Sequence, residues 1–116
     1  MDEHIINFLK KCEIPFDSKQ LDGHLLPREI MLSDTIYNKV RGDLDHLREK
    51  YSSSYLTALQ KTAEIDQKWP LLNLVRQLLK MNSYIMKPVR KSDGYTKEGK
   101  KKFRRFFVIQ KVKSVK

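Results

Sequence analysis

The stretch from residue 69 to residue 109 constrains the fold of this chain most, because it predicts one helix followed by two strands. Pro70 suits the first position of a helix, where the missing N–H removes no hydrogen bond. Apolar residues then recur at helical spacing and fill one broad side of the predicted helix. Two β-favouring runs follow, Tyr84–Val89 and Phe103–Ile109, separated by a polar, glycine-containing segment. The apolar helix positions are Leu71, Leu72, Leu74, Val75, Leu78 and Leu79.

The opposite side of this predicted helix is polar and carries no carboxylate. Its amides and cations can hydrogen-bond base edges, and the cations can also reach phosphates. Any amphipathic helix has a polar side, although an ordinary solvated side usually mixes both signs of charge. Nucleic-acid contact and a plain solvent-facing side both stay open. The residues of this side are Asn73, Arg76, Gln77 and Lys80.

The net charge of +10 is confined to the last third of the chain. Residues 1–81 hold 12 basic and 12 acidic residues, whereas residues 82–116 hold 12 basic residues against Asp93 and Glu98. Such asymmetry predicts a polyanionic partner on that side. We expect nucleic acid rather than an anionic membrane or an acidic protein surface, with a solubilising basic tail as the alternative explanation.

Most of the excess charge falls within the expected hairpin. Long cationic side chains on two strands and their loop would have the fixed spacing that phosphate contacts need. Tyr95 lies among them and can either stack on a base or ribose or simply shield the turn. The candidate phosphate-binding residues are Arg90, Lys91, Lys97, Lys100, Lys101, Lys102, Arg104 and Arg105.

The pattern also predicts details of the hairpin. Pro88 makes the first strand an edge strand, because proline cannot donate to a ladder. The loop from about Ser92 to Lys101 is long for a hairpin and should be mobile at its tip. Both faces of the second strand are apolar beyond Arg105, so we expect both to be covered there.

The first third of the chain gives weaker signals. Asp2 is expected to cap a helix that reaches about Cys12 and ends before Pro15. A polar loop should follow over residues 17–24. Residues 25–32 fit either one helical turn or an extended link.

The middle of the chain predicts two helices. Ser33 is expected to cap a helix of about 17 residues, in which Gly42 costs about 1 kcal/mol and could mark a kink or a close neighbour. Ser54 is expected to cap the next helix, which should end near Ile65. Trp69 should pack under the turn that follows, and base stacking by its indole is the less favoured alternative. The expected inner positions of the second helix are Leu56, Leu59, Ala63 and, less clearly, Tyr55.

Two helices joined by a tight turn and followed by a basic hairpin have the order of elements of a winged-helix module, a variant of the helix-turn-helix. The expected fold class is therefore mainly α with a C-terminal β-hairpin (α+β). We expect an N-terminal helix and linker over residues 1–32, a winged-helix-like domain over 33–112 and a basic tail over 113–116.

Three segments of this chain resemble small, uncharacterised basic proteins of the nucleocytoplasmic large DNA viruses. They are residues 68–77 (KWPLLNLVRQ), 90–95 (RKSDGY) and 102–107 (KFRRFF), and the resemblance covers roughly residues 25–110. Its most specific part is the pattern around Trp69 and Gly94. The resemblance implies expression in an infected cell, in a viral factory or in the particle. It implies no biochemical activity, so no functional residue is taken from it.

Signatures of catalysis and of metal binding are missing from the sequence. His4, His24 and His46 are scattered, and Cys12 stands alone, so no set of ligands has zinc spacing and no intrachain disulfide can form. The glycines do not make a phosphate-binding motif of the Walker or dinucleotide type. We expect no enzyme activity, no cofactor and no metal.

Membrane and export signals are also missing. No apolar run approaches the roughly 20 residues of a membrane span, and the N-terminus lacks the basic region of a signal peptide. We expect an intracellular, non-membrane protein, located in the host-cell cytoplasm or nucleus or in the virion if it is viral.

Three functional hypotheses follow. The first is a DNA-binding protein that places helix 70–81 in or along the major groove and the hairpin on phosphates, with DNA favoured over RNA. The second is a structural or interaction protein, such as a minor component of a viral particle, whose hairpin binds an acidic partner or the genome. The third is an accessory subunit that docks on a polymerase or nuclease through its N-terminal helix, and exposed apolar residues in segment 2–32 would be its mark. The sequence leaves specificity and oligomeric state open.

Overall fold

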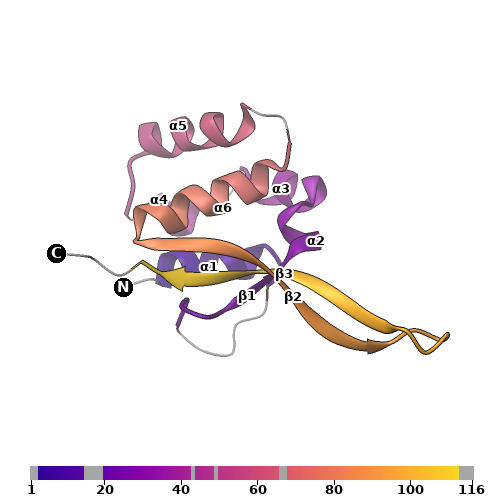
Figure 1. The fold of residues 1–116 in the computed structure, drawn as a ribbon. Helices are drawn as coiled ribbons and strands as arrows, with labels where there is room; N and C mark the ends of the chain where they lie inside the picture. The colour runs from indigo at the N-terminus through magenta and orange to yellow at the C-terminus, as the bar shows by residue number, and fades with distance from the viewer. Residues whose placement is uncertain (1–2, 15–19, 43, 49, 66–67, 113–116) are drawn as a thin grey trace.

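The computed structural model describes residues 3–14, 20–42, 44–48, 50–65 and 68–112. Helices pack into one body, and a long antiparallel hairpin crosses this body and projects beyond it (Figure 1). The fold is α+β, which confirms the expected class at that level. Its elements are α1 (Glu3–Lys11), β1 (Leu25–Pro27), α2 (Arg28–Met31), α3 (Asp34–Val40), α4 (Asp45–Arg48), α5 (Ser53–Glu64), α6 (Pro70–Met81), β2 (Tyr84–Tyr95) and β3 (Lys101–Lys111).

The N-terminal helix α1 forms where it was predicted and packs its apolar side into the core. Ile5, Phe8 and Leu9 are fully buried. The expected cap Asp2 and the expected stop Pro15 lie outside the described residues. Residues 25–32 contain both of the structures considered for them, an extended link and one helical turn, because the short strand β1 runs directly into the helical turn α2.

The single helix expected after Ser33 is instead two helices. Ser33 does cap α3, since its Oγ accepts a hydrogen bond of 3.2 Å from the Ile36 N–H. The helix then ends at Val40, and α4 follows separately, so the prediction of about 17 continuous residues was wrong. The break lets the two halves pack on different partners: α3 contacts α6, and α4 contacts α1.

The helix α5 is capped by Ser52 rather than by Ser54. The Ser52 Oγ accepts from the Tyr55 N–H at 3.1 Å, and Ser54 lies within the first turn. Leu56, Leu59 and Ala63 are buried as predicted, whereas Tyr55 is exposed. The helix ends at Glu64, next to the expected position.

The helix α6 matches its prediction closely. Pro70 occupies the first turn, and all six apolar positions between Leu71 and Leu79 are buried. Two residues, Asn82 and Ser83, separate the end of α6 at Met81 from β2, which contacts α6.

The three strands form an antiparallel sheet in the order β1-β3-β2. β2 is an edge strand, as Pro88 indicated. The strands run further than predicted, to Tyr95 and from Lys101, so the connecting turn is much shorter than the expected loop. Inside this turn the Thr96 N–H donates to the Lys100 carbonyl at 2.8 Å, and Gly99 has a φ of 83°.

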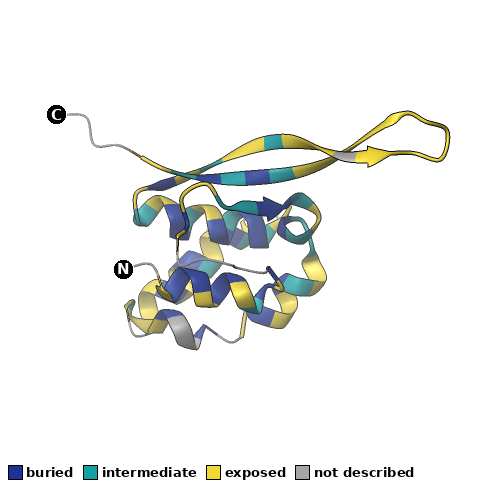
Figure 2. Cartoon of the chain, turned by 90° about the horizontal axis from the view of Figure 1, so that it is seen from below, coloured by how far each residue is buried: buried dark blue, intermediate teal, exposed yellow. Residues whose placement is uncertain are grey.

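Only one face of the sheet is buried at its base. Tyr84, Phe107 and Ile109 are buried on the face that packs on the helices. On the opposite face Phe106 and Val108 are half-buried and Ile85 is 40% exposed, so the expectation that both faces are covered was wrong. The burial pattern along the hairpin changes to full exposure as it leaves the body (Figure 2).

The segments before and after residue 32 share one core and one sheet. Phe8 from α1 belongs to the same buried cluster as Leu74 from α6, and β1 pairs with β3. The expected basic tail, residues 113–116, lies outside the described residues. Among the helices that the structure describes, none is long and apolar enough to cross a membrane.

Candidate nucleic-acid interface

Residues 90–105, called the arm below, form the part of the hairpin that extends beyond the body. Apart from Asp93, whose side chain is not described, every residue of the arm is exposed. Arg90 lies directly opposite Arg105 in the ladder, and Lys91 lies opposite Arg104. Because successive side chains alternate between faces, these two pairs put cations on both faces of the ribbon.

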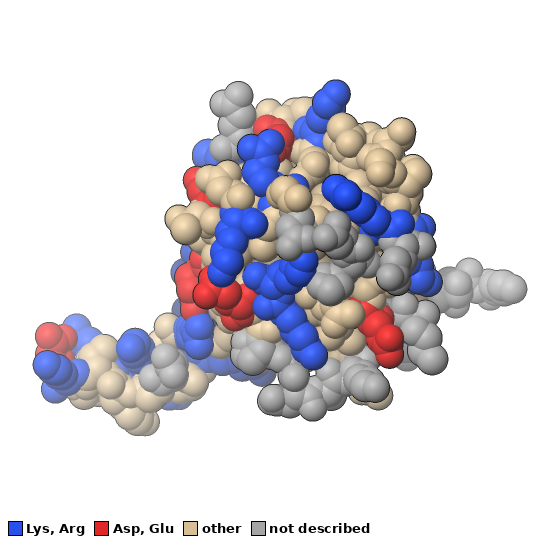
Figure 3. Space-filling view, turned by 180° about the vertical axis from the view of Figure 1, so that it is seen from behind, with Lys and Arg blue, Asp and Glu red and all other residues tan. Residues whose placement is uncertain are grey.

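These cross-strand pairs place like charges side by side, which costs a hairpin stability. Near the tip Lys97, Lys100, Lys101 and Lys102 are all exposed as well. On the face drawn in Figure 3, acidic and basic side chains are interspersed over the body, whereas basic ones outnumber acidic ones along the arm. The arm is therefore a concentrated positive charge on a paired, two-stranded frame.

Aromatic rings hold two of the arm's arginines. The Arg90 guanidinium lies over the Phe103 ring, 4.4 Å from its centre, and the Arg104 guanidinium lies 5.1 Å from the centre of the Phe106 ring. A cation–π contact uses the face of a guanidinium and not its N–H groups, which can still bind an oxygen at the edge. Tyr95, the aromatic candidate from the sequence, is 70% exposed near the turn.

Arg104 also tethers the arm to the body. Its Nε donates to Oε1 of Glu29 in α2 at 2.9 Å, and its Nη2 contacts the same oxygen. Burial acts to raise the pKa of Glu29, but the hydrogen bonds from Arg104 and from the Glu29 backbone, with the guanidinium charge, lower that pKa overall. Arg104 is thus already paired with a carboxylate.

A pocket of about 270 Å³ lies where the arm meets the body. Arg28, Arg90 and Arg105 line it, and no carboxylate is among its described lining residues. Its remaining walls come from Pro88, Val89, Phe106 and Phe107. Sequence reasoning missed Arg28, because nothing in the sequence placed α2 beside the hairpin.

The polar side of α6 divides into two kinds of residue. Arg76 and Lys80 are exposed, whereas Asn73 and Gln77 are half-buried. The Asn73 Nδ2 donates to the carbonyls of Ala63 at 3.3 Å and Lys68 at 3.2 Å, so this side chain braces the turn between α5 and α6. Figure 1 shows that α6 begins, and the arm leaves the body, at the same end of the molecule.

Trp69 does not pack under the turn, contrary to the prediction. Its side chain is 43% exposed, and its backbone is left-handed with a φ of 54°. It lines a hollow of about 360 Å³ together with Lys68, Leu72, Asn73 and Arg76. The turn conformation, rather than hydrophobicity, directs the indole outward.

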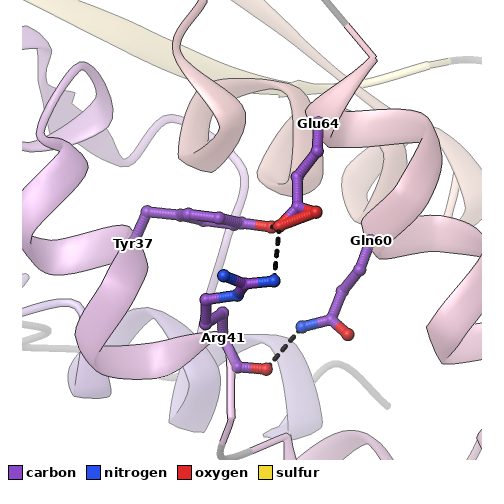
Figure 4. A network of polar contacts seen from close by, with 4 residues as sticks. All are labelled: Tyr37, Arg41, Gln60 and Glu64. Carbon is purple, nitrogen blue, oxygen red and sulfur yellow. Dashed lines mark hydrogen bonds and ion pairs between the residues drawn. The ribbon is translucent and has the colours of Figure 1, made fainter. Parts of the chain in front are cut away.

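A second polar cluster joins α3 to α5 (Figure 4). The Tyr37 hydroxyl donates to Glu64 Oε1 at 2.6 Å, Arg41 Nη2 lies 3.0 Å from the same oxygen, and Gln60 donates to the Arg41 carbonyl. Burial, followed by the Glu64 carboxylate, raises the pKa of the Tyr37 hydroxyl well above its usual value. This phenol stays protonated at neutral pH, so the cluster serves to hold the two helices together.

Within the described part of the chain, no group of three potential metal-ligating side chains comes together. Comparisons with protein-family models, with curated proteins and with solved structures find no match to this chain.

Proposed function

We propose that this protein binds nucleic acid, with duplex DNA as the favoured ligand, through the arm and the exposed side of α6. The observation that carries the proposal is the pairing of Arg90 with Arg105 and of Lys91 with Arg104 on a fully exposed ribbon. Like charges placed opposite one another lower the stability of a hairpin, so we attribute this arrangement to phosphate binding.

The order of elements supports a winged-helix reading of the fold. α5, a short turn, α6 and the hairpin follow one another, and β1 adds a third strand against β3. In this reading α6 is the recognition helix and the arm is the wing. The six residues of β2 in the arm span about 20 Å and the five of β3 slightly less, enough to follow a groove, and the major groove admits a two-stranded ribbon.

The test removes charge from the arm without touching its frame. A variant with Lys100→Ala, Lys101→Ala and Lys102→Ala should bind all duplex sequences about equally more weakly, since phosphate contacts carry no sequence information. The matched control replaces the exposed body residues Lys10, Lys50 and Lys61 by alanine and removes the same charge. Fluorescence anisotropy with labelled duplexes measures the DNA affinity of both variants. Equal losses from the two variants would refute a specific role for the arm.

The second candidate, binding of an acidic protein partner, has one observation of its own. The outer face of the sheet exposes Ile85 and half-exposes Phe106 and Val108 beside the cations, which is a mixed surface suited to a protein interface. Co-purification with particle subunits, together with indifference to added DNA, would decide for it. The third hypothesis, an accessory subunit of a polymerase or nuclease, predicts exposed apolar residues near the N-terminus. No large apolar side chain is exposed among the described residues of segment 3–32.

A further inference from the structure

Trp69 has a backbone conformation that a bulky residue avoids. Its φ of 54° and ψ of 57° lie in the left-handed region, where the Cβ of an L-residue is crowded. It also precedes Pro70, and the residue before a proline favours an extended conformation. Strain of this kind persists only where the surroundings impose it, and it is concentrated at functional sites.

The surroundings that impose it can be identified. The Asn73 side chain bonds to the Lys68 carbonyl, and the Asn73 N–H bonds to the Trp69 carbonyl at 3.1 Å. The Asn73 side-chain Nδ2 also donates to the Ala63 carbonyl near the end of α5, so the turn is fixed to both helices. The turn holds the indole of Trp69 at the surface, where it is 43% exposed.

The surface around the indole has the chemistry of a nucleotide site. The Lys68 ammonium lies over the ring, 5.8 Å from its centre, and the exposed Arg76 lines the same hollow of about 360 Å³. No carboxylate is among the described residues that line it. An aromatic platform beside cations is the combination by which proteins hold single nucleic-acid strands.

We infer that the hollow at Trp69 binds one unpaired nucleobase, which stacks on the indole while Lys68 and Arg76 contact the adjoining phosphates. The base must be unpaired, because the faces of a base within a duplex are already covered by its neighbours. This inference rests on the proposed function and adds a second kind of contact to it. Nucleic acid with a single-stranded segment would then be bound more tightly than a blunt duplex, provided the duplex is matched in length.

Trp69 is the only tryptophan, so its fluorescence reports on this site directly. A thymidine oligonucleotide should quench the indole emission, and a blunt duplex of the same length should quench it far less. Trp69→Ala should weaken binding of the labelled single strand about fivefold to a hundredfold, as loss of one stacked base does. Trp69→Phe keeps an aromatic face and should retain part of the affinity. Duplex binding should change less than threefold in both variants.

Ile65→Ala is the matched control, because Ile65 is another apolar residue near this turn and is 75% exposed. It should leave single-strand binding unchanged. The stacking site is overturned, while the proposed function stands, if the duplex binds but two results are negative. These are that single strands do not quench Trp69, and that Trp69→Phe and Trp69→Ala bind single strands as tightly as the wild type does. If neither ligand binds at low salt, both proposals fail.

Discussion

The left-handed conformation of Trp69 costs about 1–2 kcal/mol for any residue with a Cβ, whereas glycine adopts it freely. Elsewhere in a folded chain alanine is the more stabilising of the two, because glycine loses more entropy on folding. At position 69 we expect glycine to be the more stabilising of the two. We predict that Trp69→Gly is more stable than Trp69→Ala by about 1 kcal/mol in urea unfolding. Alanine more stable than glycine would show that the turn does not hold this conformation in solution.

Cys12 is fully buried, and this burial raises the pKa of its thiol to about 12 from an ordinary value of 9.0, with a smaller contribution from Glu13. The unfolded chain therefore loses the thiol proton at lower pH than the folded chain does. The stabilising effect is complete below about pH 9 and is lost as the pH rises toward 12.

We accordingly predict that the free energy of unfolding falls between pH 9 and 10 with a slope that approaches about 1.4 kcal/mol per pH unit. Burial and the Glu64 carboxylate raise the pKa of Tyr37 as well. Because its ordinary value is 10.0, its contribution to the pH dependence of unfolding begins at higher pH than that of Cys12. A Cys12→Ala variant should lose most of this slope, whatever its starting stability. Urea unfolding at a series of pH values measures it, and an unchanged slope in the variant would contradict the assignment.

At the scale of whole elements, the arm combines antiparallel pairing, with a register shift between Ser92 and Tyr95, and unfavourable charge. Arg105 faces Arg90 across the ladder, so Arg105→Glu converts a repulsive pair into an attractive one. We predict a gain of about 0.5–1 kcal/mol in stability together with weaker DNA binding. Thermal unfolding and anisotropy measure the two effects.

The control for this exchange is Lys61→Glu, which makes the same change in net charge on the exposed surface of α5. It should affect binding much less and should not raise stability. A loss of stability in Arg105→Glu would mean that the two arginines are not repelling each other in solution.

The elements that could be predicted are those specified by their own sequence. α6 has a helical apolar period and a proline at its start, and both features appear unchanged in the fold. β1 could not be predicted, because three residues become a strand only by pairing with β3 far along the chain. The break after Val40 leaves α3 and α4 packed on two different helices, which the sequence does not show, and the roughly 1 kcal/mol by which Gly42 disfavours a helix acts in the same direction.

The candidate site was predictable to a similar degree. The basic cluster was evident from charge alone, but its distribution over both faces of a ribbon follows from the register, which the sequence did not specify. The chemistry of Asn73 predicts a base contact, but its side-chain amide donates to two backbone carbonyls instead. The hydrophobicity of Trp69 predicts a buried side chain, whereas the braced turn directs it outward.

At the scale of the whole molecule, a near-neutral body carries one strongly basic projection. Residues 1–81 have no net charge, and the excess lies on the hairpin and the residues after it. Two contacts on the same end of the molecule follow from the proposals: the arm would hold phosphates, and the start of α6 would hold bases. The first contact supplies affinity that depends on salt, and the second supplies discrimination between ligands.

The most direct test of this account is the salt dependence of duplex DNA binding by the wild-type chain. If six to eight cations of the arm neutralise phosphates, log K should fall linearly with log salt at a slope of roughly −5 to −7. Anisotropy titrations at several salt concentrations give this slope. The account predicts tight binding at low salt with that slope; no binding at low salt, or a slope near zero, would contradict it.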